Sequence, residues 1–283
     1  MRVLSRHLVR MALVVVLGGF VGATLVRMAP GFGVDEEELD SRLNDASRSA
    51  LRRSKEGLAV FYARYGKQLL HGDLGMSIAF HEPVRDLLAE RIPETAKTIG
   101  VGLAVGWTCG LGLAIACGIV RNRWIEWSAT LAATLFLCIP AAVLALLFVL
   151  AEAPGRLAAG LIVFPKIFQF TRNLLARSAA LPHTVTARAK GLNEWQVMAR
   201  HVLPVAAPQL LALGGVSVCM VLGACIPVEV LCDLPGIGQL AWKAALSRDL
   251  PLLVNLTMLV TLITLAANLA VDVAGGTAQE RNA

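Results

Sequence analysis

The sequence predicts an all-α membrane protein with six transmembrane helices, and two observations carry that prediction. Hydrophobic residues make up 56% of the 283 residues and the mean hydropathy is +0.65, which is too apolar for an ordinary soluble domain. These residues are also clustered into runs, most of them close to the roughly 20 helical residues that cross a bilayer core of about 30 Å. The six runs are 8–26, 96–120, 127–151, 157–170, 206–231 and 252–273. Because backbone polar groups in lipid must pair within their own segment, we expect each run to be a helix.

The first transmembrane helix is predicted within residues 1–29. Arg2, Arg6 and Arg10 precede its apolar run, as basic residues also precede the apolar part of a secretory signal peptide. Met28-Ala29-Pro30 is a poor cleavage site, however, and five further runs already commit the chain to the membrane. We therefore predict that this helix is retained.

Residues 30–95 are predicted to form an extracytoplasmic segment with short amphipathic helices. One apolar series with helical spacing comprises Leu58, Phe61, Tyr62, Tyr65 and Leu69. A glycine-containing turn at 72–77 follows, and a second helical pattern begins near Val84. The alternative is a plain linker, but apolar stripes of this kind favour helices that rest on the outer membrane surface.

Residues 96–273 are predicted to form a five-helix core that contains a polar cytoplasmic loop at 171–205. The fourth run is short and carries Lys166, so we expect that its helix extends into the flanking residues. Residues 274–283 are predicted to be a cytoplasmic tail.

Basic residues sort by loop and predict the orientation. One side of the predicted membrane carries Arg2, Arg6, Arg10, Arg121, Arg123, Arg172, Arg177, Arg188, Lys190, Arg200 and Arg281. The short loops of the other side carry Arg156, Lys243 and Arg248. The positive-inside rule therefore places both termini in the cytoplasm and residues 30–95 outside. The net charge of +6 is explained by this topology, and basic residues so dispersed do not indicate nucleic-acid binding.

The loop 171–205 is predicted to contain a short helix, a break at Gly191 and a second helix that stops near Pro204. An apolar stripe runs through Val185, Ala189, Leu192 and Trp195. This loop is either a solvated basic connection or a docking element. The small residues Ala187, Ala189 and Gly191 would allow a partner to approach closely, and an exposed Trp195 favours docking.

The sequence contains none of the common catalytic motifs. It has no GxxxxGK[ST] phosphate-binding loop, no HExxH and no GxSxG, and its six cysteines show no CxxC spacing. We therefore expect no catalytic residues, no metal site and no cofactor. If ATP drives this protein, another chain hydrolyses it.

The TARAKGL–HVLP segment resembles the EAA loop of permease subunits in binding-protein-dependent ABC importers. In that pattern a Gly is followed by nine residues, an apolar position, a spacer and Leu-Pro; here nine residues separate Gly191 from His201-Val202-Leu203-Pro204. Further collinear similarities to the dipeptide, oligopeptide and nickel permease branch are GDLGMS at 72–77, Pro83-Val84, RIPET at 91–95, EVLCDLPGIG at 229–238, RDLP at 248–251 and NLAVD at 268–272.

This resemblance implies a type I ABC importer permease fold in a bacterial cytoplasmic (inner) membrane, with the loop as a coupling helix seated on an ABC ATPase subunit. The coupling residues that it implies are Ala187, Arg188, Ala189, Lys190, Gly191, Leu192, His201, Leu203 and Pro204. It implies as further partners a second permease subunit in a heterodimer, an extracytoplasmic substrate-binding protein and membrane lipid, with no nucleic acid. The chain departs from the pattern at Val185, where Glu is usual, and in the short loop at 152–156.

Candidates for the translocation path or outer gate are Glu229, Pro235, Gly236 and Gly238. A carboxylate at membrane depth is expensive to bury and is a functional candidate. The alternative is that Glu229 lies at the interface and is hydrogen-bonded to the Pro-Gly turn.

The predicted function is that of a permease subunit for peptides or similar small solutes; the branch also handles nickel chelates and glutathione. The alternative is an ion-gradient-driven secondary transporter that works without an ATPase. The sequence shows neither an intramembrane acidic relay nor an inverted repeat, which disfavours that alternative.

Overall fold

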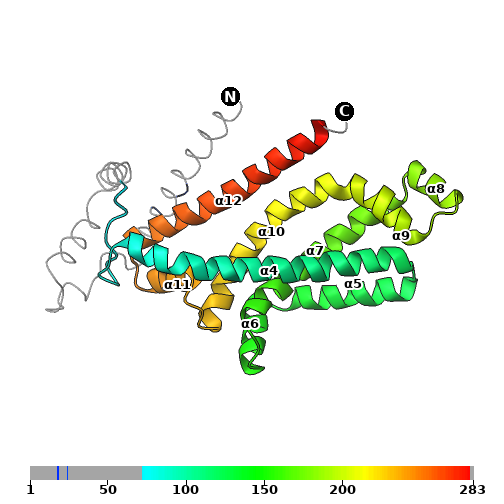
Figure 1. The fold of residues 1–283 in the computed structure, drawn as a ribbon. Coiled ribbons are helices and arrows are strands. Elements are labelled where there is room, and N and C mark those ends of the chain that lie inside the picture. The colour runs from blue at the N-terminus through cyan, green and yellow to red at the C-terminus, as the bar shows by residue number, and fades with distance from the viewer. Residues whose placement is uncertain (1–17, 19–23, 25–71, 281–283) are drawn as a thin grey trace. The chain divides into compact units, whose positions relative to one another are not determined.

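The computed structural model describes residues 18, 24 and 72–280, and its side chains up to residue 271. Among these residues the chain is helical, with one isolated β-bridge between Met76 and Pro83. The predicted first helix and the apolar series at 58–69 lie outside the described residues. The helices, labelled as in Figure 1, are α4 (Val84–Val120), α5 (Arg123–Cys138), α6 (Ala141–Leu150), α7 (Arg156–Ala179), α8 (Pro182–Ala189), α9 (Glu194–Val197), the π-helix η2 (Met198–Val202), α10 (Leu203–Leu231), α11 (Ile237–Leu246) and α12 (Leu250–Glu280).

The described residues form two compact units. One comprises 72–95 and 235–265, and it therefore contains the start of α4, all of α11 and most of α12. The other comprises 96–234 and 266–280, and it holds α5 to α10. We call them the 72–95/235–265 unit and the 96–234 unit.

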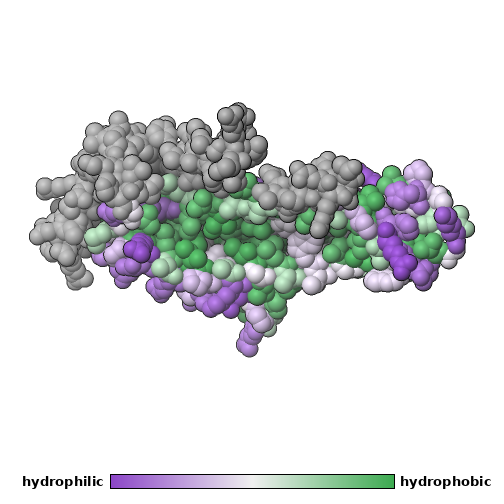
Figure 2. All heavy atoms as spheres, turned by 45° about the horizontal axis from the view of Figure 1, so that its top comes forward, coloured by the Kyte–Doolittle hydropathy of each residue, from purple (hydrophilic) through white to green (hydrophobic). Residues whose placement is uncertain are grey.

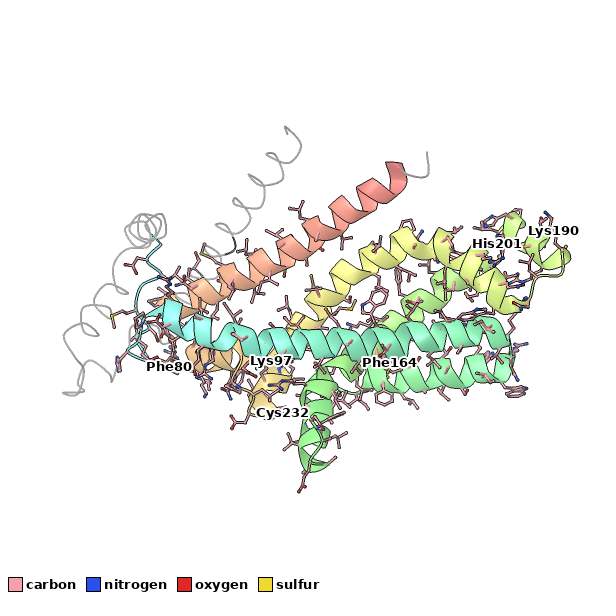
Figure 3. All side chains as sticks on the ribbon, viewed as in Figure 1. Phe80, Lys97, Phe164, Lys190, His201 and Cys232 are labelled. Carbon is pink, nitrogen blue, oxygen red and sulfur yellow. The ribbon has the colours of Figure 1, made fainter. Side chains whose placement is uncertain are left out.

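In the 96–234 unit, α7 packs against both α10 and α5. A first core gathers around Phe168 and Val202, and a second around Ile167, Val221 and Val228. Phe164, labelled on α7 in Figure 3, meets Phe136 of α5 edge to face at a ring-centroid distance of 5.9 Å. Buried aliphatic and aromatic side chains of α7 therefore pack against both α5 and α10.

Glycines let α4 and α7 approach closely. A Cβ added to Gly110 would lie 2.8 Å from Cγ2 of Ile167, and one added to Gly160 would lie 2.5 Å from Cβ of Val105. Small residues at a helix interface allow backbones to pack this tightly in membrane proteins.

The prediction that the third run, 127–151, forms one continuous helix is wrong. It divides into α5 and α6, which are bent by 95° relative to each other. The break falls at Ile139-Pro140, where Pro140 has no N–H and restricts the residue before it to an extended conformation. The chain leaves the helix there and restarts it in a new direction.

Three described helical segments are long and apolar enough to cross a membrane: Val84–Val120, Glu194–Leu231 and Leu250–Val271. The bent pair α5–α6 would make a fourth if it forms one span. The fourth predicted run does extend into its flanks as α7, a helix of 24 residues that carries Arg156, Lys166, Arg172 and Arg177 and is not among these segments.

In the 72–95/235–265 unit, a third core joins the start of α4 to α11 and α12. Its buried members include Val84, Leu87, Leu240 and Leu252. The hydroxyl of Thr95 accepts a hydrogen bond of 2.7 Å from the N–H of Ile237, which fixes the first turn of α11.

Candidate functional site

The candidate coupling element is α8 with the turn after it. Pro182 occupies the first helical turn of α8, where its missing N–H costs nothing. The Thr184 hydroxyl, fully buried, donates to the carbonyl of Ser178 at 3.1 Å. Two residues after the end of α8, Gly191 has a φ of +87°, a left-handed conformation that favours glycine. The predicted break at Gly191 is therefore present.

The second helix begins with a capping box. The Asn193 side chain accepts from the N–H of Gln196 at 2.8 Å, and the Gln196 side chain accepts from the N–H of Asn193 at 3.2 Å. The N-terminal end of this helix is thereby stabilised by its own side chains.

The prediction that this helix stops near Pro204 is wrong. The helix continues from Glu194 to Leu231, and Pro204 lies in the first turn of α10. The π-helix η2 lies immediately before it, and the N–H of Leu203 bonds to the carbonyl of Met198 five residues back. A π turn has an altered hydrogen-bond pattern, so a proline can follow it without breaking the helix.

Glu194 connects α8 to the turn between α4 and α5. Its carboxylate accepts hydrogen bonds from Arg188 at 3.1 Å and from Arg121 at 3.0 Å. Arg188 also donates to the carbonyl of Ala179, at the end of α7, at 3.0 Å. These contacts, which we call the Glu194 bridge, hold α8 against two neighbouring elements.

The predicted coupling residues separate into exposed and internal groups. Ala189, Lys190, Gly191 and Pro204 are exposed. Ala187, Arg188, Leu192, His201 and Leu203 are buried or half-buried. Figure 3 shows Lys190 at the α8 end of the unit and His201 close by; the His201 ring centroid lies 6.4 Å from that of His183.

Ala187 differs from its predicted role as a small residue that a partner approaches. It is 4% exposed and belongs to the first core, because it lies on the face of α8 that packs against the bundle. The outward apolar side chains are those of Val185, at 53% exposure, and Trp195, at 60%. Figure 2 shows hydrophilic residues interspersed with apolar ones at this end of the unit.

A cleft of about 610 Å³ is lined by residues of α4, α7 and α8. The sequence analysis did not predict this cleft. Its charged lining comprises Arg121, Glu126, Arg172 and Arg188. Arg172 donates to Glu126 at 2.6 Å. The sequence does show that charged residues lie at the ends of the predicted spans. Which of these charges pair with one another depends on tertiary contacts, and the sequence pattern does not specify them.

Glu229 belongs to the 96–234 unit, whereas Pro235, Gly236 and Gly238 belong to the 72–95/235–265 unit. Glu229 is fully buried in α10, and its backbone carbonyl accepts from the N–H of Leu234 at 2.9 Å. Pro235 is exposed, whereas Gly236 and Gly238 are buried at the start of α11. Burial of the Glu229 side chain disfavours a position open to solvent. Within the described residues, no group of three or more His, Cys, Asp or Glu side chains could hold a metal ion.

The chain is similar to known transport proteins along most of its length. The oligopeptide transport system permease protein OppB of Escherichia coli K12 is 29% identical over 271 aligned positions, which cover 88% of each chain. A putative peptide permease protein of Brucella suis is 26% identical and covers 88% of this chain and 89% of its own.

The fold is similar to that of a solved chain of the MetNI methionine ABC transporter in an inward-facing conformation. The TM-score is 0.57 at 20% identity, over 66% of this chain and 95% of that one. The profile of the family described as "binding-protein-dependent transport system inner membrane component" matches residues 110–280, which is more than half of the chain. The protein therefore belongs to this family and is a multi-pass inner-membrane permease component of an ABC importer.

Proposed function

We propose that this permease subunit forms a translocation path for peptides or similar small solutes together with a second, homologous permease subunit. An extracytoplasmic binding protein delivers the solute, and separate ABC ATPase subunits hydrolyse ATP. The peptide relatives from Escherichia coli and Brucella suis support the substrate class. Family membership supports the use of a binding protein.

The observation that carries the coupling role is the outward face formed by α8, the turn after it and α9. Val185 and Trp195, which flank the exposed Lys190 in the sequence, expose apolar surface within a basic loop. Exposed aromatic and aliphatic side chains of this kind mark interaction sites. An ATPase groove with an acidic rim and an apolar floor would match them.

The internal coupling residues orient that face. The Glu194 bridge ties Arg188 to Arg121, and Leu192 and Leu203 pack against the first core. A displacement of α8 by the ATPase would therefore act on the bundle through charged and apolar contacts together. Switching between access states by rigid-body motion needs such a connection.

The proposed topology retains six spans with both termini in the cytoplasm. The bent pair α5–α6 counts as the third span and α7 as the fourth. Residues 1–29 supply the first, 30–95 lie outside, 96–273 form the five-helix core and 274–283 form the cytoplasmic tail. Glu229, Pro235, Gly236 and Gly238 remain proposed residues of the path or outer gate.

The test is purification of the tagged permease from bacterial membranes. We expect an ABC ATPase and a second permease to co-purify with the wild-type chain, and a reconstituted complex to take up radiolabelled tetra-alanine only with ATP and binding protein. Lys190→Glu and Trp195→Ala should each lower uptake at least about fivefold, the lower range of coupling between sites. Arg177→Glu, which reverses another exposed charge near the end of α7, is the matched control.

Two outcomes would contradict this proposal. Unchanged ATP-driven uptake in both Lys190→Glu and Trp195→Ala would show that the end of α8, the turn after it and α9 do not form the coupling element. Uptake by the wild-type chain without an ATPase, driven by an ion gradient, would establish the secondary transporter instead.

A further inference from the structure

The loop 72–83 is held by one buried carboxylate from the far end of the chain. Asp249, the residue before α12, has no exposed surface. Its Oδ2 accepts hydrogen bonds from the Ser77 hydroxyl, from the N–H of Ile78 at 2.9 Å and from the N–H of Ala79 at 3.1 Å. Its Oδ1 accepts from the N–H of Leu252 at 3.1 Å, in the first turn of α12. We call this set of contacts the Asp249 clamp.

A second polar side chain of α12 holds the same loop. Asn255 donates from Nδ2 to the carbonyl of Leu74 at 2.9 Å and to that of Pro251 at 2.8 Å. Asp249 and Asn255 thus contact the loop at two separate points, one on each side of Gly75. The loop is therefore fixed to α12 in one register.

The loop also has a shape of its own. The N–H of Val84 bonds to the carbonyl of Gly75 at 3.0 Å, and the N–H of Ser77 bonds to that of Glu82 at 2.9 Å. Gly75 has a φ of +78°. Met76, which is 40% exposed, and Glu82 remain on the outside of the loop.

The use of a buried carboxylate in the Asp249 clamp indicates a role other than stabilisation of the fold. A buried carboxylate is costly to desolvate, and an apolar contact of equal volume often stabilises a fold as well or better. Here, four donors from two distant segments converge on one carboxylate beside the positive end of a helix. Such an arrangement fixes position and orientation, because charge-assisted hydrogen bonds depend on geometry.

We propose that Asp249 is a positioning residue of the transport cycle, which makes the loop 72–83 and the start of α12 move as one body. A binding protein that docks on the outer side of the loop then acts directly on the last span. This inference rests on the proposed function, because it requires the loop to lie outside and a binding protein to engage the permease.

The first test compares Asp249→Ala with Asp86→Ala in the assembled complex. Asp86 is an exposed carboxylate in the first turn of α4 and belongs to the same unit. We expect Asp249→Ala to leave basal ATP hydrolysis intact and to lower binding-protein-stimulated hydrolysis and tetra-alanine uptake at least about fivefold. The control should keep both. Normal stimulation in an assembled Asp249→Ala complex would overturn the proposal.

A reducible cross-link separates positioning from folding. In right-side-out vesicles, the oxidised double variant Ser77→Cys/Asp249→Cys should recover the uptake that Asp249→Cys alone loses. Reduction with dithiothreitol, carried out until a thiol count shows that the buried cross-link has opened, should abolish that recovery and reoxidation should restore it, whereas a folding defect would not respond. Failure of the oxidised double variant to recover uptake would overturn the clamp as a positioning device.

The wild-type arm distinguishes the two proposals. If the wild-type complex shows neither stimulation by binding protein nor peptide uptake, the proposed function falls, and the role of Asp249 falls with it. If the wild type transports and the Asp249 variants transport and respond to the binding protein as well as it does, the proposed function stands and the clamp alone is refuted.

Discussion

Glu194 accepts hydrogen bonds from two arginines that lie in different parts of the chain. Arg188 is close in sequence, but Arg121 is 73 residues away, in the turn between α4 and α5. The three side chains are partly exposed, with exposed fractions between 23% and 54%. The Glu194 bridge therefore orients α8 more than it stabilises the fold.

We predict that Glu194→Gln changes the free energy of unfolding by only about 0–1 kcal/mol, as is typical of exposed ion pairs. Peptide uptake per ATP hydrolysed should nevertheless fall, because α8 loses its charged connection to Arg121. The two measurements are thermal unfolding of the purified complex and uptake against ATP hydrolysis in proteoliposomes. Unchanged coupling, or a large loss of stability, would contradict an orienting role.

Gly191 supplies the second prediction at this scale. Its φ of +87° is incompatible with proline, whose ring fixes φ near about −65°, and an alanine there would cost about 1–2 kcal/mol. Gly191→Pro should abolish ATP-driven uptake, and Gly191→Ala should reduce it. Gly214→Ala is the control, since Gly214 lies within α10 in a helical conformation and a Cβ there meets nothing within 4 Å. Full uptake by Gly191→Pro would exclude a coupling turn at this position.

At the scale of elements, glycine positions determine how closely α4 and α7 pack. A Cβ at Gly110 would lie 2.8 Å from the Ile167 side chain and 3.1 Å from the backbone nitrogen of Phe168. Gly112, on the same helix, has nothing within 4 Å. Gly110 therefore faces α7 closely, whereas Gly112 has open space where a side chain would lie.

We predict that Gly110→Ala destabilises the chain by about 1–3 kcal/mol, because the backbone of α7 cannot yield and the core becomes overpacked. Gly112→Ala should leave stability unchanged or raise it slightly through its better helix propensity. Thermal unfolding of the two variants in the same detergent decides the matter. Equal stability of both variants would show that α4 and α7 are not in close contact.

Element boundaries were predictable where local chemistry determines them. The break at Gly191 follows from the glycine in the sequence, whereas α11 after the Pro-Gly turn was not predicted, because residues 237–246 lie between two of the long apolar runs. At Pro204 the prediction of a helix end was wrong, because η2 precedes the proline and the helix continues through it. At Pro140 the predicted run divides into two helices, and the prediction of one continuous helix took no account of this proline. The local effect of a proline depends on the hydrogen bonds around it, which a single sequence does not specify.

At the scale of the whole molecule, clustered apolar residues predicted an all-helical membrane protein, and the family was identified from short collinear motifs. The internal contacts were not predictable. Ala187 is buried in the first core, and Arg188 is paired with Glu194. Such pairings arise when helices far apart in sequence pack together, so periodicity within one helix carries no information about them.

The helical segment from Glu194 to Leu231 has a mechanical consequence. At about 1.5 Å per residue, its 38 residues correspond to roughly 57 Å of helix, which is interrupted by η2 and carries Pro208 and Pro227 in its interior. Because π turns and prolines are the positions at which helices usually bend, a displacement of the end near Trp195 is expected to reach the rest of α10 as a change of bend at these positions.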